Sequence, residues 1–336
     1  TGSSYLTAKL TGKYVIDQFL AKGSFRPLYN RDGTINKENC SLYCRPDQIA
    51  ECAYSFEIAG TVTEEAAKES GLKKGTPVIV GTGDSTAEAI SVGLVESGTV
   101  FFQYVSANGN GSLKGGKEFT IPGIFCIGDG TNAAGTLTRW VRDTFYEEEL
   151  KKERAGGENA YAVMAREAAE VEAGSEGLII LPYIYGERSP IQDAKASGML
   201  FGLKGTHTRK QINRAALEAV GYSTLQHMIL FDEMNLPPKS VITAGGGTKN
   251  AAWMQIICDM IGRQICIPKR YQCSAYGDAA MAALGDRRFR DFTELRDSLP
   301  KGKILVPNEK NHIYYKEHYK MFRDLYLNNK DMMHRI

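Results

Sequence analysis

The segment at residues 78–87 constrains this chain more than any other. It reads Val-Ile-Val-Gly-Thr-Gly-Asp-Ser-Thr-Ala. A short β-branched run ends in a Gly-rich turn, and small residues typical of a tightly packed helix follow it. The turn places one carboxylate, Asp84, at the carboxyl end of a predicted strand, where open α/β sheets bind their ligands. The pattern therefore predicts that Asp84 acts on a substrate.

A second Gly-rich turn occupies residues 241–250, which read Val-Ile-Thr-Ala-Gly-Gly-Gly-Thr-Lys-Asn. It also connects a predicted strand to a predicted helix, but it carries no carboxylate. Bare backbone of this kind lets a large, flat ligand approach closely. Each turn has a purely structural interpretation as well: Asp84 could be a helix N-cap, and Gly245–Gly247 could be a plain strand-to-helix connection.

Composition excludes several classes of protein. The chain has 336 residues and a formal net charge of +2, which argues against a dedicated nucleic-acid binder. Its sequence contains no long apolar run of the kind that spans a membrane, and the first residues do not resemble a signal peptide. The seven cysteines form no CxxC pair, and the five histidines form no HxxxH or HExxH frame. We therefore expect reduced thiols, a cytoplasmic protein and no metal site built from His and Cys.

Strands and helices alternate along the chain after residue 75, which predicts an α/β fold. The clearest helix spans 208–234, where Thr208 is the expected cap and Gln211 completes a capping box. A shorter helix at 63–69 has Thr63 as its cap, and residues 108–111 read as a turn. The other predicted helices span 5–20, 85–93, 135–150, 161–173, 251–261, 276–284 and 314–328. The predicted strands span 77–81, 99–106, 178–184, 240–244 and 263–267.

Common nucleotide and hydrolase motifs are missing from the sequence: it has no GxxxxGK[ST], no GxGxxG and no GxSxG. Residues 198–203 and 211–218, however, fit the long second signature of the FGGY carbohydrate kinases at every position. The chain also resembles that family in its catalytic block (81–84), its Gly-Glu-Arg-Ser-Pro block (186–190), its adenosine motif (244–250, with Trp253 and Gln255) and its first helix (5–12). Within the family it looks most like the xylulose kinases, with the gluconate kinases next.

The resemblance implies an actin/Hsp70/hexokinase-like (ribonuclease-H-like) α/β fold of two domains with a cleft between them. Residues 1–75 would be the remnant of the first, sugar-binding domain, and residues 76–336 would form the second, ATP-binding domain. The implied reaction is ATP-dependent phosphorylation of a sugar hydroxyl, with D-xylulose as the expected substrate and gluconate or ribulose as alternatives. The implied ligands are ATP with Mg²⁺ and a small-molecule sugar. No nucleic-acid or membrane partner is expected. A homodimer is possible.

The resemblance also assigns roles to individual residues. Asp84 would be the general base, and Asp84 and Ser85 would contact the sugar. The nucleotide would be bound by Ser106, Gly135, Arg139, Gly246 and Asn250. The Arg139-Trp140 pair and the Gly-Glu-Arg-Ser-Pro block also have structural interpretations, as an amphipathic pair and as a salt-bridged turn.

Two departures from the family pattern matter. The family begins with a strand and a phosphate loop of the DxGTT type, and neither is in this sequence. We therefore expect a further segment before Thr1, without which residues 1–336 would phosphorylate no sugar. At 105–107 the family's Gly-Thr-Ser type of turn is replaced by Val-Ser-Ala. The alternative to an active sugar kinase is a non-catalytic relative that binds nucleotide or has a regulatory role.

Overall fold

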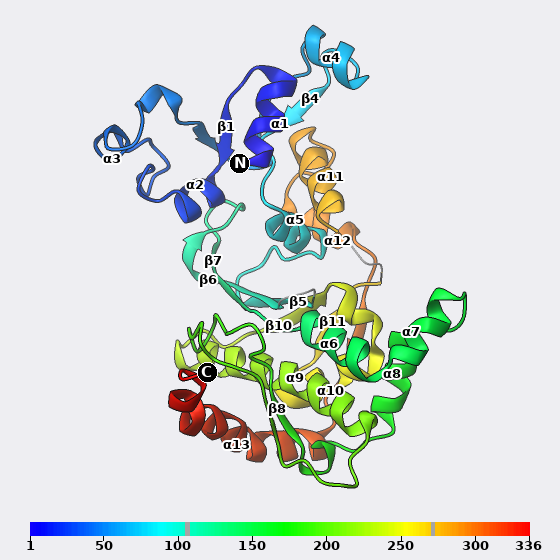
Figure 1. Cartoon of the computed structure of the whole chain (residues 1–336). Coiled ribbons are helices and arrows are strands. Elements are labelled where there is room, and N and C mark those ends of the chain that lie inside the picture. Colours follow the sequence, from blue (N-terminus) through cyan, green and yellow to red (C-terminus); the bar gives the residue numbers. More distant parts are fainter. Residues whose placement is uncertain (105–107, 270–272) are drawn as a thin grey trace. The chain divides into compact units, whose positions relative to one another are not determined.

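The chain folds into two compact units in the computed structural model, which describes residues 1–104, 108–269 and 273–336 (Figure 1). Unit 1 comprises Thr1–Thr99, Ser112–Ile127 and Gln272–Lys301. Unit 2 comprises Val100–Gly111, Gly128–Tyr271 and Gly302–Ile336. The first unit thus continues past residue 75, the limit that the resemblance implied for the first domain, and takes in two later segments of the chain.

Unit 1 is built from short strands and helices. A parallel pair joins β1 (Val15–Asp17) to β2 (Glu51–Ala53), and an antiparallel pair joins β3 (Ile58–Thr61) to β4 (Pro77–Ile79). Its most extensive helix contact joins α5 (Asp84–Ser91) to α11 (Ser274–Gly285), where Gly277 lies directly against the backbone of Ala87. A Cβ at residue 277 would overlap that backbone, so the close approach requires glycine. The remaining helices of unit 1 are α1 (Gly2–Thr11), α2 (Gln18–Ser24), α3 (Lys37–Ser41), α4 (Glu64–Ser70) and α12 (Phe292–Ser298).

Unit 2 contains most of a six-stranded sheet with the order β12-β11-β10-β5-β6-β7. β10 and β11 are parallel, and β11 and β12 are antiparallel. The strands are β5 (Thr99–Tyr104), β6 (Asn108–Glu118), β7 (Phe125–Thr131), β10 (Ser240–Ala244), β11 (Ile265–Ile267) and β12 (Lys303–Leu305). A separate antiparallel pair joins β8 (Ile179–Leu181) to β9 (Met199–Phe201).

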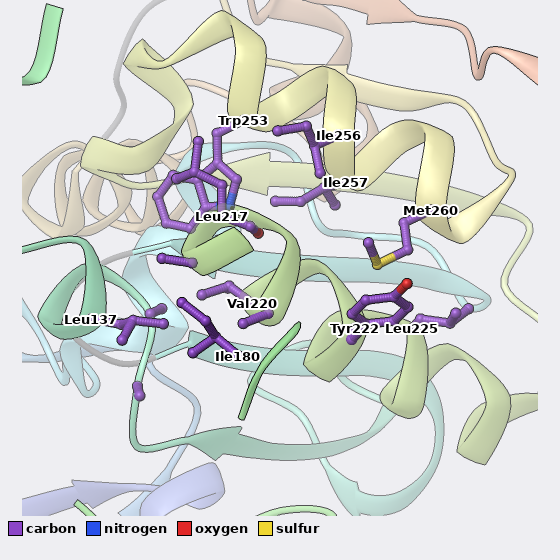
Figure 2. Close-up of a cluster of buried hydrophobic side chains, with 14 of the residues drawn as sticks. Leu137, Ile180, Leu217, Val220, Tyr222, Leu225, Trp253, Ile256, Ile257 and Met260 are labelled. Atoms are coloured by element: carbon purple, nitrogen blue, oxygen red, sulfur yellow. Dashed lines mark hydrogen bonds between the residues drawn. The ribbon is translucent and has the colours of Figure 1, made fainter. Parts of the chain in front are cut away.

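Among the described residues, six α-helices complete unit 2. They are α6 (Gly135–Phe145), α7 (Glu147–Arg154), α8 (Ala160–Ala169), α9 (Arg209–Glu233), α10 (Ala251–Ile261) and α13 (Glu309–Met333). The long helix α9 is central, because it packs on α6, α8, α10 and β8. Figure 2 shows how it does so: Val220 of α9 lies beside Ile180 of β8, while Leu217 of α9 lies beside Trp253 of α10. These side chains are part of one buried hydrophobic cluster, which fixes the walls of the cavity described below.

The predicted α/β alternation is confirmed, and several elements were predicted to the residue. α10 and β10 have the expected bounds, and α9 begins after Thr208, whose capping box with Gln211 forms. Thr63 caps α4 as expected.

Three local predictions are wrong. Residues 5–20 do not form one helix, because Gly12 adopts a left-handed conformation (φ 72°) that ends α1. The chain then forms β1 and α2 instead. Residues 108–111 begin β6 rather than a turn, and the helix predicted at 135–150 divides at Tyr146 into α6 and α7.

Candidate functional site

A cavity of about 500 Å³ lies within unit 2, and most of the residues that the resemblance assigned to nucleotide binding line it. Gly135, Arg139, Gly246 and Asn250 all line it. They come from two segments more than a hundred residues apart in the chain. The other lining residues are Tyr104, Thr138, Asn159, Tyr161, Ala162, Met164, Ala165, Asn213, Leu217, Gly247, Lys249 and Trp253.

The turn after β10 forms one wall of this cavity, and each of its three glycines has a different surrounding. Gly245 has φ 94° and packs directly on the backbone of Tyr104, so a side chain there is excluded. A Cβ at Gly247 would lie 2.7 Å from the ring of Trp253. A Cβ at Gly246 would meet no atom within 4 Å. Gly246 therefore leaves open space at the cavity wall, which suits the flat face of a base.

Asn250 ends this turn and begins α10. Its side chain accepts a hydrogen bond from the backbone N–H of Trp253 at 3.0 Å, which makes it the N-cap of the helix. Trp253 is held in turn, because its indole N–H donates to the carbonyl of Leu217 at 3.2 Å. The Trp253 ring centroid also lies 5.6 Å from that of Tyr104. The floor of the cavity is thus a rigid aromatic surface.

The first turn of α6 forms a second wall. Gly135 is the first residue of α6, and Arg139 follows four residues later on the same face. Leu137 and Val141 point the other way and are fully buried. Arg139 is exposed, while its neighbour Trp140 packs on the hydrophobic cluster. The Arg139-Trp140 pair therefore has the predicted amphipathic character and still presents the guanidinium to the cavity.

The third wall comes from α8 and α9 and was not predicted from the sequence. Asn159 caps α8 by accepting from the N–H of Tyr161 at 3.1 Å. Asn213 of α9 donates to the carbonyl of Met164 at 2.7 Å, which fixes α8 against α9. The one sequence signal for this wall is Asn213 itself, which lies inside the signature at 211–218.

The charges at the cavity are of one sign. Arg139 and Lys249 line it, and no Asp or Glu does so among the described residues. Neither cation forms an ion pair within the described part of the chain. Two uncompensated cations beside apolar and aromatic walls suit a ligand that is flat at one end and anionic at the other.

The Gly-Glu-Arg-Ser-Pro block supports the start of α6. Glu187 is buried and accepts from the backbone N–H of Asn132 at 2.6 Å. Arg188 donates to the side chain of Asn132 at 2.9 Å and to the carbonyl of Thr131 at 3.2 Å. These bonds fix the segment that leads from β7 into α6, and so they position Gly135.

Asp84 lies in unit 1, at the first residue of α5. The N-cap of α5 is Gly83, so the interpretation of Asp84 as the N-cap is wrong. Its carboxylate is exposed and accepts one hydrogen bond, from the backbone N–H of Ser85 at 2.8 Å. Ser85 is exposed beside it. Both side chains are thus accessible to a substrate.

Ser106, the remaining predicted nucleotide ligand, lies outside the described residues. Within the described ranges there is no group of three or more His, Cys, Asp and Glu side chains suited to a metal ion. None of the described helices has both the length and the apolar character that a membrane span needs.

Comparisons with known proteins find sugar kinases that are similar to this chain. A xylulose kinase of Staphylococcus epidermidis is 28% identical over 290 residues, which cover 83% of this chain and 56% of that protein. A gluconokinase of Bacillus subtilis is 26% identical over 308 residues, covering 88% of this chain and 60% of that protein. The chain therefore spans little more than half the length of these curated relatives.

The crystal structure of a xylulose kinase from Rhodospirillum rubrum superimposes with a TM-score of 0.86 at 28% identity, covering 98% of this chain and 67% of that one. This likeness confirms the predicted actin/Hsp70/hexokinase-like fold. Residues 100–285, more than half of the chain, match the model described as "FGGY family of carbohydrate kinases, C-terminal domain". The matched segment begins where unit 2 begins and contains every lining residue of the cavity. The chain therefore belongs to the FGGY family of carbohydrate kinases.

Proposed function

We propose that this protein transfers the γ-phosphoryl group of ATP to a hydroxyl of a small sugar, with the nucleotide bound in the unit 2 cavity. The observation that carries the proposal is the convergence of Gly135, Arg139, Gly246 and Asn250 on one cavity. The adenine would lie at Gly246 against the aromatic floor. The guanidinium of Arg139 would stack on the base, and Lys249 would face the phosphates.

Asp84 is the proposed general base, because it is an accessible carboxylate in a Gly-rich turn. It takes the proton from the sugar hydroxyl as that oxygen bonds to the γ-phosphorus, and the bond from the γ-phosphorus to the bridging oxygen breaks to release ADP. Ser85 would contact the sugar. Mg²⁺ would arrive with ATP, since this ion is held largely by phosphate oxygens and water and needs few protein ligands. When bound, it would neutralise phosphate charge.

D-xylulose is the proposed substrate, with D-xylulose 5-phosphate as the product in the cytoplasm. The xylulose kinases of S. epidermidis and R. rubrum support this choice, each at 28% identity. Gluconate is the second candidate, because the B. subtilis gluconokinase is 26% identical over a longer stretch. The division of roles, with sugar bound by unit 1 and ATP by unit 2, is also part of the proposal.

The test is a coupled ADP-release assay on the full-length product of the gene, with D-xylulose, D-ribulose, gluconate and glycerol as separate substrates. The proposal expects the highest kcat/KM with D-xylulose. A higher value with gluconate would move the assignment to the second candidate. Tight ATP binding without ADP release from any sugar would favour the non-catalytic relative.

A further inference from the structure

A buried carboxylate in unit 1 has no part in the chemistry proposed above. Asp17, the last residue of β1, has a relative exposure of 0%. It forms no ion pair among the described residues, and the hydrogen bonds and desolvation that act on its carboxyl involve no cation. Burying a charge without a partner is strongly unfavourable. Asp17 therefore calls for a specific explanation.

Helix capping explains only one of the two carboxylate oxygens. Oδ1 of Asp17 accepts from the backbone N–H of Phe19 at 2.7 Å and caps α2. This helix has seven residues, and Ser, Thr or Asn would cap it equally well without a charge. The second oxygen, Oδ2, accepts from the hydroxyl of Thr82 at 2.7 Å. Thr82 is 65 residues further along the chain and two residues before Asp84.

Hydrogen bonds hold each of the three residues 80–82, which lead into the turn that carries Asp84. The backbone N–H of Val80 donates to the carbonyl of Glu57 at 3.0 Å, and the N–H of Gly81 donates to the carbonyl of Ser55 at 2.9 Å. Gly81 has φ 71°, so the chain turns sharply there. The bond from Thr82 to Asp17 is the last of these anchors before the helix begins, and it joins two side chains.

We propose that Asp17 and Thr82 are positioning residues, which hold the Gly81–Asp84 turn so that the carboxylate of Asp84 meets the sugar hydroxyl. β1, β4 and α5 belong to the same unit, so this coupling is internal to unit 1 (Figure 1). Asp17 itself cannot be the base, because it is fully buried while Asp84 is exposed. The inference rests on the proposed phosphoryl transfer, in which a base displaced by about 1 Å can lose up to about a hundredfold in rate.

The test is a double-mutant cycle that combines Thr82→Val with Asp84→Asn in the full-length protein. Thr82→Val removes the hydroxyl and keeps the shape of the side chain. It should lower kcat by about tenfold or more and leave the dissociation constant for ATP within about twofold. Thr82→Ser keeps the hydroxyl and should restore most of kcat. In the Asp84→Asn background, Thr82→Val should have little further effect, because both changes act through the same carboxylate.

Two readouts separate this proposal from a purely structural role. Amide hydrogen exchange at residues 82–84 should be faster in Thr82→Val than in Thr82→Ser, while the melting temperatures of the two stay close. Thr82→Ala, which also lacks the hydroxyl, should repeat the Val result if Val does not fold. An equal loss of kcat from Thr82→Val with and without Asp84 would overturn the positioning role. A wild-type protein that phosphorylates no sugar would instead refute the proposed function, and this inference with it.

Discussion

The side chain of Asn250 and the backbone of Trp253 are joined by a hydrogen bond of 3.0 Å that starts α10 at the cavity wall. Asn250 therefore has two separable roles. Its Oδ1 caps the helix, and its Nδ2 has no partner among the described residues. Ser can take over the first role but not the second.

We expect Asn250→Ser to keep the stability of the protein and to weaken ATP binding. Asn250→Ala should weaken ATP binding and also lower the free energy of unfolding by about 1 kcal/mol, because it removes the cap. Calorimetric titration with ATP and a urea melt measure the two effects. ATP affinity in Asn250→Ser equal to wild type would mean that the amide does not contact the nucleotide.

Gly246→Val should fold normally and lose ATP affinity by about tenfold or more. The added Cβ meets no protein atom within 4 Å, so its branches enter the space assigned to the base. A steric penalty of about 1.4 kcal/mol or more on ATP binding corresponds to this tenfold loss of affinity. The matched control is Gly205→Val, whose Cβ also meets nothing and which does not line the cavity. If both variants bind ATP equally well, the base does not lie at Gly246.

Asp84→Asn should reduce turnover by about 10² to 10⁴ and leave ATP affinity nearly unchanged. The amide keeps an oxygen to accept from the N–H of Ser85, so the turn is preserved, but it cannot take a proton. Steady-state kinetics with D-xylulose and titration with ATP check the two parts. Near-normal turnover would remove Asp84 from the mechanism.

Local sequence patterns predicted the parts of the fold that depend on neighbouring residues. The capping box of Thr208 and Gln211 and the glycines after β10 are of this kind. Residues 108–111 were mispredicted because Asn and Gly favour turns locally, whereas the structure incorporates them into β6 of the six-stranded sheet. Asn159 and Tyr161 were missed for a related reason. They line the cavity because α8 packs on α9, and no short sequence pattern predicts a contact between two helices.

Arg139→Gln should weaken adenosine and ATP binding by a similar factor, about three- to tenfold, if the guanidinium stacks on the base. A contact to phosphate would instead weaken ATP much more than adenosine. Arg154→Gln is the control, since Arg154 is an exposed arginine of unit 2 that does not line the cavity. Unchanged affinity for both ligands would exclude Arg139 from the site.

The stability of the protein should depend on pH through Asp17. Burial raises the pKa of this carboxyl to about 6, from an ordinary value of 3.8, against the opposing effect of its hydrogen bonds to Thr82 and Phe19. The folded state then binds the proton more tightly than the unfolded state. The stabilisation is complete below about pH 4 and is lost as the pH rises through about 6, by about 3 kcal/mol.

Asp17→Asn isolates this contribution. The amide can still accept from the N–H of Phe19 and can donate to the hydroxyl of Thr82, but it does not titrate. Burial raises the pKa of the nearby Cys52 to about 11, so this thiol does not titrate between pH 4 and pH 8. Urea melts between pH 4 and pH 8 should therefore show the variant gaining stability relative to wild type as the pH rises through 6. Parallel profiles for the two proteins would mean that Asp17 titrates near its ordinary pKa in the folded state and that its burial costs little.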